Sequence, residues 1–78
     1  MTGAEVEVEY CVPCGFLDRA EAIQHQLLQQ FGQRLDSVAL VTGDHGVLCV
    51  RVDGDVVWDK SDDEYDLDEI TRRLREHV

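Results

Sequence analysis

Hydrophobic and charged side chains alternate strictly near the start of the chain. From Glu5 to Tyr10, Val6, Val8 and Tyr10 stand on one side, and three glutamates stand on the other. A period of two residues with one charged face predicts a half-buried β-strand. The sheet that contains this strand is therefore expected to expose one face to water.

A helical spacing of apolar residues follows and runs as far as Phe31. Its members recur every three or four positions: Phe16, Ala20, Ile23, Leu27 and Phe31. This spacing predicts an amphipathic helix, with Leu17 and Leu28 widening its apolar stripe. Gly32 is suited to end the helix, and Pro13 is suited to its first turn, where a missing N–H is not needed.

Three short apolar runs in the second half of the chain predict further strands. They cover residues Val38–Val41, Val47–Val52 and Val56–Trp58. Turn-forming residues separate them, first at positions 43–46 and then at the Asp53-Gly54 pair, which is typical of a β-hairpin.

A final helix is predicted after an acidic loop. Asp66 is its expected N-cap, with Glu69 three residues further on. The inner face is expected to consist of Leu67, Ile70, Leu74 and Val78. Basic residues in its C-terminal half suit the negative end of the helix dipole.

The predicted order is β-α-β-β-β-α, which defines the fold class. A strand–helix–strand start favours a parallel first pair, and the hairpin adds antiparallel strands. The acidic face of the first strand places both helices on the other face. We therefore expect a two-layer α/β fold with a mixed four-stranded sheet, formed by one domain over residues 1–78.

The charge balance is strongly acidic. Seventeen Asp and Glu residues face seven Lys and Arg residues, giving a formal net charge of −10, and Lys60 is the single lysine. Nucleic-acid binding is disfavoured because it depends on basic side chains that neutralise phosphate. The acid excess and the scarcity of lysine favour adaptation to a salt-rich cytoplasm, where self-repulsion is screened.

Neither a targeting segment nor a membrane-spanning segment is recognised. The N-terminal residues turn acidic at once, and no apolar run approaches the roughly 20 residues that a spanning helix needs. We therefore expect a cytoplasmic protein with no membrane partner.

The candidate chemistry lies in Cys11-Val12-Pro13-Cys14, a C-x-x-C pair that directly follows the first strand. Cys11 is expected at the N-cap of the first helix, with Cys14 one turn in, where unpaired N–H groups stabilise a thiolate. Such a pair can attack a partner disulfide and then resolve the mixed disulfide. Cys11, expected at an exposed tip, is assigned as the attacking thiol and Cys14 as the resolving thiol. Tyr10 and Phe16 flank the pair and could form an apolar platform for a partner.

Structural zinc is the main chemical alternative for the pair. A tetrahedral zinc site needs four ligands, usually including a second close pair. The chain offers only isolated further candidates: Cys49, His25, His45 and His77. Redox chemistry is therefore favoured over zinc, and no metal or cofactor is expected. Cys49 is interpreted as a packing residue, and His25 and His45 as solvated side chains.

Two segments resemble the selenoprotein W or Rdx family, the group that contains selenoproteins T, W and H. The first is VEYCVPCGF over Val8–Phe16, which is similar to the strand and Tyr-Cys-x-x-Cys opening of that family. The second runs from Val50 to Lys60 and is similar to its hairpin, which ends near a tryptophan and a lysine. The resemblance implies a thioredoxin-like fold and thiol redox function through Cys11 and Cys14. It also places Cys14 where some members carry selenocysteine, so the roles of the two sulfurs stay open.

Two functions from different classes follow. The first is a small thiol–disulfide oxidoreductase whose partners are proteins or low-molecular-weight thiols and disulfides. The second is a non-catalytic and redox-gated interaction module. A zinc-binding domain is a third hypothesis. The resemblance and the acidic composition together lead us to expect a halophilic archaeal source, and the oligomeric state is left open.

Overall fold

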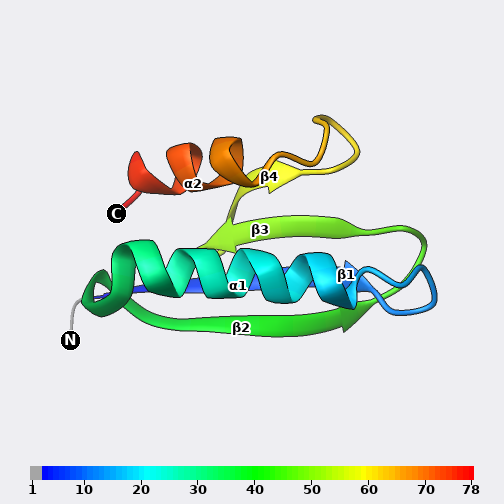
Figure 1. Ribbon diagram of the computed structural model, residues 1–78, viewed down its shortest axis with the longest axis horizontal. Helices are drawn as coiled ribbons and strands as arrows, with labels where there is room; N and C mark the ends of the chain where they lie inside the picture. The colour runs from blue at the N-terminus through cyan, green and yellow to red at the C-terminus, as the bar shows by residue number, and fades with distance from the viewer. Residues whose placement is uncertain (1–2) are drawn as a thin grey trace.

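The computed structural model describes residues 3–78 and contains a four-stranded sheet and two α-helices (Figure 1). The strands are β1 Ala4–Cys11, β2 Leu35–Gly43, β3 Leu48–Val52 and β4 Asp55–Asp59. The helices are α1 Leu17–Phe31 and α2 Leu67–Arg75, with a short 3₁₀ turn, Gly32–Arg34, after α1. The observed order is β-α-β-β-β-α, which confirms the prediction.

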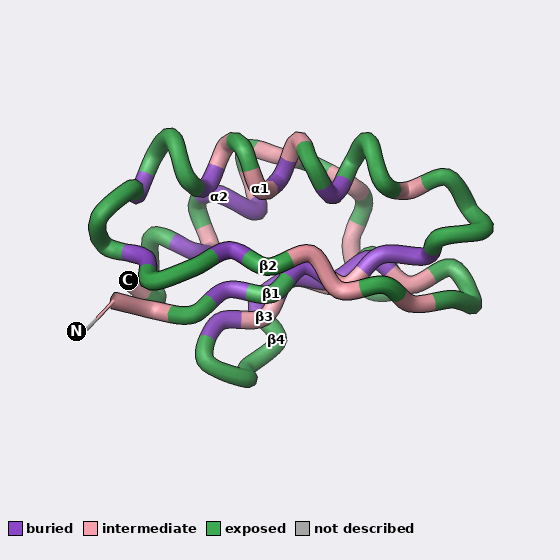
Figure 2. The backbone as a smooth tube through the Cα atoms, turned by 90° about the horizontal axis from the view of Figure 1, so that it is seen from below, coloured by how far each residue is buried: buried purple, intermediate pink, exposed green. Residues whose placement is uncertain are grey.

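The sheet is mixed, and its strands lie in the order β2-β1-β3-β4. β1 runs parallel to β2 and antiparallel to β3, and β3 pairs with β4 in an antiparallel hairpin. Both helices lie on one side of the sheet (Figure 2). This arrangement is a two-layer α/β fold of the thioredoxin-like kind, and it leaves the glutamate face of β1 without a helix over it.

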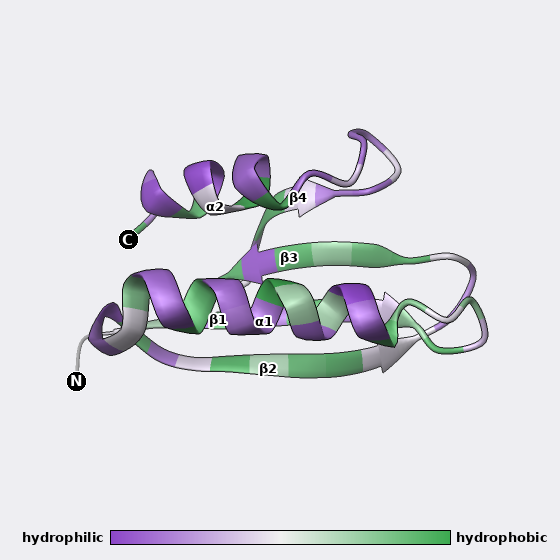
Figure 3. Ribbon diagram, in the orientation of Figure 1, coloured by the Kyte–Doolittle hydropathy of each residue, from purple (hydrophilic) through white to green (hydrophobic). Residues whose placement is uncertain are grey.

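The core lies between the sheet and the two helices. Val6, Val8 and Trp58 are buried on the sheet. The residues of α1 that face them are Ala20, Ile23, Leu27 and Phe31, and those of α2 are Ile70, Thr71 and Leu74. Figure 3 shows α1 in alternating hydrophobic and hydrophilic bands, whereas α2 is mainly hydrophilic. The predicted burial of Ile70 and Leu74 and of the α1 positions from Ala20 to Phe31 is therefore confirmed. Val78, predicted on the inner face of the last helix, lies beyond the end of α2.

The helix ends follow local rules. The carboxylate of Asp66 accepts hydrogen bonds from the backbone N–H groups of Asp68 at 3.1 Å and Glu69 at 3.3 Å. Gly32 ends α1 with φ +46°, a conformation that favours glycine. Both predicted boundaries are confirmed.

The predicted width of the apolar stripe on α1 is wrong. Leu17 and Leu28 are exposed, at 43% and 45% of their full surface. Leu28 follows buried Leu27 and therefore points about 100° further around the helix, beyond the reach of the sheet. Leu17 is the first residue of the helix and lies beyond the buried stripe that begins at Ala20.

Three of the four strands are longer than the segments that predict them, whereas β3 starts at Leu48, one residue later than its predicted run. β2 starts at Leu35 and ends at Gly43, since its backbone pairs with β1 along its whole length. Polar residues at its ends contribute hydrogen bonds rather than hydrophobic burial.

Within the described residues, no helix has the length and apolar character needed to cross a membrane.

Candidate functional site

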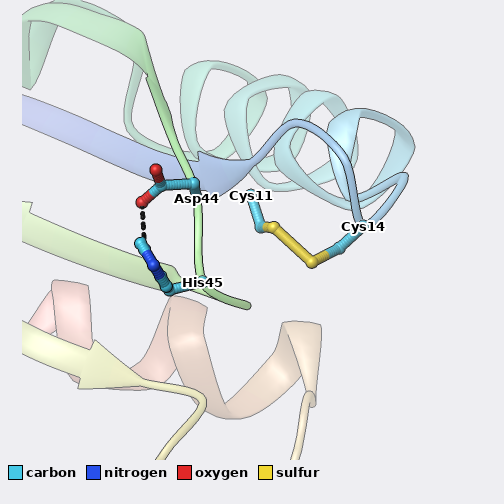
Figure 4. Close-up of a disulfide and its surroundings, with 4 residues drawn as sticks. All are labelled: Cys11, Cys14, Asp44 and His45. Atoms are coloured by element: carbon cyan, nitrogen blue, oxygen red, sulfur yellow. Dashed lines mark hydrogen bonds and ion pairs between the residues drawn. A yellow bond between two sulfur atoms is a disulfide. The ribbon is translucent and has the colours of Figure 1, made fainter.

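Cys11 and Cys14 are joined by a disulfide at one end of the sheet (Figure 4). Cys11 is the last residue of β1, and Cys14 lies in the loop between β1 and α1. Their Cα atoms are 5.3 Å apart, within the range that a disulfide spans without movement of the backbone. The structure therefore brings together the two residues that the spacing singles out.

The predicted position of the pair on the helix is wrong. α1 begins at Leu17 with Phe16 as its N-cap, so both cysteines and Pro13 precede the helix. A separate turn lies between β1 and α1. In this turn Gly15 has φ +76°, and its N–H donates to the carbonyl of Val12 at 3.1 Å. The field of a helix terminus acts mainly within its first turn. Cys14 lies outside that turn, so the predicted placement of its sulfur in the first turn of the helix is wrong.

The two cysteine residues differ in exposure, and the difference is the reverse of the expectation. Cys11 is fully buried, whereas Cys14 is exposed. The premise that Cys11 occupies an exposed tip is therefore wrong. Cys11 is a paired strand residue, and its N–H donates to the carbonyl of Val47 at 2.7 Å. Only Cys14 is open to an approaching partner in the disulfide form.

The β2–β3 connection holds the start of the dithiol loop. Gly43 pairs with Cys11, and its carbonyl accepts the N–H of Val12 at 3.1 Å. A Cβ at position 43 would meet Val47 Cγ1 at 2.8 Å and Glu9 Oε2 at 2.7 Å. Gly43 therefore lets this connection approach closely. The sequence predicts a turn at Gly43 but gives no sign of its contact with the dithiol loop, because that contact depends on the parallel pairing of β1 with β2.

The apolar surface beside Cys14 comes from residues other than those expected. Tyr10 is buried on the helix side of the sheet, and Phe16 is half-buried. Val12 is 50% exposed, and Leu17, at the start of α1, is also exposed. Val12 and Leu17 are thus the exposed apolar side chains that lie nearest to Cys14 in the sequence.

Cys49 is a buried free thiol in β3, which confirms its interpretation as a packing residue. It lies opposite Glu9, and Arg51 Nη1 lies 3.4 Å from its sulfur. Arg51 also forms ion pairs with Glu7 at 3.1 Å and Glu9 at 3.0 Å. Burial is the main cause that raises the pKa of the Cys49 thiol, and the Arg51 charge opposes it. This thiol is therefore poorly ionised.

The histidines do not join the dithiol. His45 is exposed in the β2–β3 turn, and its ring forms a hydrogen bond with the carboxylate of Asp44. Figure 4 shows that both of these side chains point away from the disulfide. His25 and His77 are exposed on other elements. Over residues 3–78 the structure assembles no cluster of three metal-ligating side chains.

The fold and the site together define a class of protein: a thioredoxin-like domain with a C-x-x-C disulfide at the end of its first strand. Residues 5–76 match the Rdx family, and the chain belongs to that family. The Rdx family is associated with thiol redox chemistry.

Solved structures agree with this assignment. A crystal structure of a protein from Bordetella parapertussis is 31% identical, with a TM-score of 0.91 and coverage of 97% of this chain and 99% of that chain. A crystal structure of a selenoprotein W-related protein from Vibrio cholerae is 22% identical, with a TM-score of 0.90 and coverage of 96% of each chain. The second likeness bears on the fold alone. No curated protein matches the chain, and these neighbours give no support to a halophilic archaeal source.

Proposed function

We propose that this protein is a thiol–disulfide redox protein that works through Cys11 and Cys14. The observation that carries the proposal is the disulfide between Cys11, a buried residue at the end of β1, and Cys14, an exposed residue in the loop that follows. Membership of the Rdx family supports it independently. A pair that closes a ring without moving the backbone can cycle between its oxidised and reduced forms with little rearrangement.

In the proposed reaction Cys14 is the attacking thiol, because it is the exposed member of the pair. Its thiolate attacks one sulfur of a partner disulfide, forms a mixed disulfide and releases the other sulfur as a thiolate. Cys11 loses its proton to solvent and attacks Cys14, which releases the second partner thiolate and closes the protein disulfide. The protein dithiol loses two electrons and the partner disulfide gains them.

Single cysteine variants test these roles. Reduced Cys11→Ser is expected to accumulate a stable mixed disulfide at Cys14 when treated with bis(2-hydroxyethyl) disulfide, because the resolving thiol is missing. Cys14→Ser is expected to form little adduct, and Cys49→Ser to behave as the unmodified protein does. Adduct masses after non-reducing digestion report each site. If mild oxidant leaves both Cys11 and Cys14 free and modifies Cys49 alone, the redox proposal is wrong.

A redox-gated interaction module is the second candidate, and the exposed side chains of Val12 and Leu17 beside Cys14 favour it. An oxidoreductase completes many cycles when it is supplied with a reductant and a disulfide substrate. A module changes its redox state once and binds its partner in one state. Steady-state turnover that Cys14→Ser abolishes supports the enzyme. Reversible oxidation without turnover supports the module.

The setting of this chemistry is also proposed. We place the protein in the cytoplasm as a single domain, with protein or low-molecular-weight thiols and disulfides as partners and no cofactor. A free dithiol persists in a reducing compartment, where disulfides in proteins are transient. Nucleic-acid and membrane partners are disfavoured by the net charge of −10.

A further inference from the structure

Two basic side chains share an aromatic ring next to the dithiol loop. The Arg19 guanidinium carbon lies 5.2 Å from the centroid of the Phe16 ring, and Lys60 Nζ lies 5.5 Å from the same centroid. Arg19 also lies 5.2 Å from the ring centroid of Tyr65. The rings hold both cations in place through cation–π contacts.

Neither cation is neutralised by a carboxylate within the described part of the chain. Arg51, Arg72 and Arg73 all form ion pairs with acidic side chains. Arg19 and Lys60 form none at 4.0 Å or less over residues 3–78, although the chain carries 17 acidic residues. Two positive groups therefore keep their capacity to bind an external anion.

A cavity lies between these groups and the β4–α2 connection. Its volume is about 470 Å³, and it is lined by Arg19, Tyr65 and the segment from Lys60 to Glu64. The lining also carries three carboxylates, Asp62, Asp63 and Glu64. Arg73 pairs with Asp63 at 3.0 Å, and the exposed side chains of Asp62 and Glu64 form no ion pair with any described residue. The cavity is a shallow depression that is open to solvent, so it can contact one end of a small molecule but cannot enclose a folded partner.

The cavity lies at the dithiol end of the molecule. Phe16, which both cations contact, is two residues after Cys14. Figure 1 shows the dithiol loop and the β4–α2 connection at the same end of the sheet. Arg19 and Lys60, which both contact Phe16, therefore lie near the segment that carries Cys14.

We propose that Arg19 and Lys60 form a subsite for the carboxylate of a low-molecular-weight disulfide that reacts at Cys14. The proposed subsite rests on the proposed redox function, and it defines the class of substrate that reacts at Cys14. A small substrate is favoured over an acidic protein, because a chain of net charge −10 repels an extended acidic surface more strongly than it repels one carboxylate near two cations. The aromatic contacts hold the two positive groups in place before the ligand arrives.

Three disulfides of similar size and different charge test the subsite. They are 3,3′-dithiodipropionate, which is dianionic, bis(2-hydroxyethyl) disulfide, which is neutral, and cystamine, which is dicationic. The rate of disulfide exchange at Cys14 is measured for each with the reduced full-length protein. Dithiodipropionate is expected to react faster than the neutral compound by about fivefold, the size expected from two partly exposed charge pairs, despite the negative net charge.

Matched double variants separate the subsite from net charge. Arg19→Gln/Lys60→Gln is expected to remove the preference for dithiodipropionate over the neutral compound. Arg34→Gln/Arg75→Gln removes the same charge from a similar cluster around Phe31, at the other end of α1, where the distances are 5.2 and 5.9 Å. This control variant is expected to keep the preference.

The outcomes distinguish the two proposals. Exchange with the neutral disulfide but no preference for the dianion overturns the subsite and leaves the redox function standing. A preference for cystamine, or an equal loss in both double variants, also overturns the subsite. Absence of exchange with all three compounds overturns the redox function, and the subsite falls with it.

Discussion

At the scale of single residues, the three cysteines have different environments. Cys14 is exposed in a loop, Cys11 is buried at the end of β1, and Cys49 is buried in β3. Thiolate fraction and access together decide the reactivity of a thiol. Only Cys14 has open access, so redox chemistry is expected to start there.

Cys49 is predicted to be inert in the folded protein. Burial raises its pKa and blocks reagents, so the oxidised protein should release almost no colour with Ellman's reagent at about pH 8. Denaturation with guanidinium should expose one thiol per chain, in agreement with a single free cysteine among the described residues. The Cys49→Ala variant is the control and should show no thiol in either state. Rapid labelling of Cys49 in the native protein would contradict its assigned burial.

The reactive pair follows from the sequence, whereas the exposure of each sulfur does not. The C-x-x-C spacing limits the distance between Cys11 and Cys14 whatever the fold. The burial of Cys11 depends on Gly43 and Val47, which are more than 30 positions away along the chain and reach it only through the pairing of β2 with β1. Such long-range contacts leave no local pattern in the sequence.

At the scale of elements, most boundaries follow from periodicity and capping residues. The exception is the start of α1. Pro13 and a helical apolar spacing suggest a start near Cys11, yet the left-handed conformation of Gly15 closes a separate turn first. A glycine after C-x-x-C is compatible with either arrangement, so the sequence does not distinguish them.

Helix α2 carries a small ion-pair network that should make stability depend on acid pH. Glu69 accepts hydrogen bonds from Arg72 at 2.7 Å and from Arg73 at 2.8 Å. These contacts lower the pKa of Glu69 from its usual value near 4.5 to about 2. A lowered pKa in the folded state means that the network stabilises the fold above about pH 4.5 and that this contribution is lost as the pH falls toward about 2.

The Glu69→Gln variant tests this network. At about pH 7 its free energy of unfolding, measured with urea, is expected to be lower than that of the unmodified protein, and the difference should close as the pH falls toward about 2. Glu21→Gln is the matched control, because Glu21 is exposed on α1 and makes no ion pair with any described residue. A difference between Glu69→Gln and the unmodified protein that is the same at every pH would show that Glu69 acts by packing and not by charge.

At the scale of the whole molecule, the dominant feature is negative charge around a thin core. The helix-free face of the sheet carries Glu5, Glu7 and Glu9, and among the described bases Arg51 pairs with the last two. The β4–α2 connection adds further acids. Self-repulsion of such a surface destabilises a compact chain, and added salt weakens the repulsion because it shortens the Debye length from about 10 Å at 0.1 M to about 3 Å at 1 M.

Sodium chloride is therefore predicted to stabilise this protein. The urea midpoint of unfolding should rise as the salt concentration increases from about 0.05 M to about 1 M, because screening relieves repulsion among the acidic groups more than it weakens the few ion pairs. Removal of exposed negative charges should give part of the same stabilisation without added salt. The Glu21→Gln/Asp55→Asn/Glu64→Gln variant lacks three exposed carboxylates and should start from a higher midpoint and respond less to salt. A midpoint that falls with salt in the unmodified protein would mean that the ion pairs outweigh the repulsion.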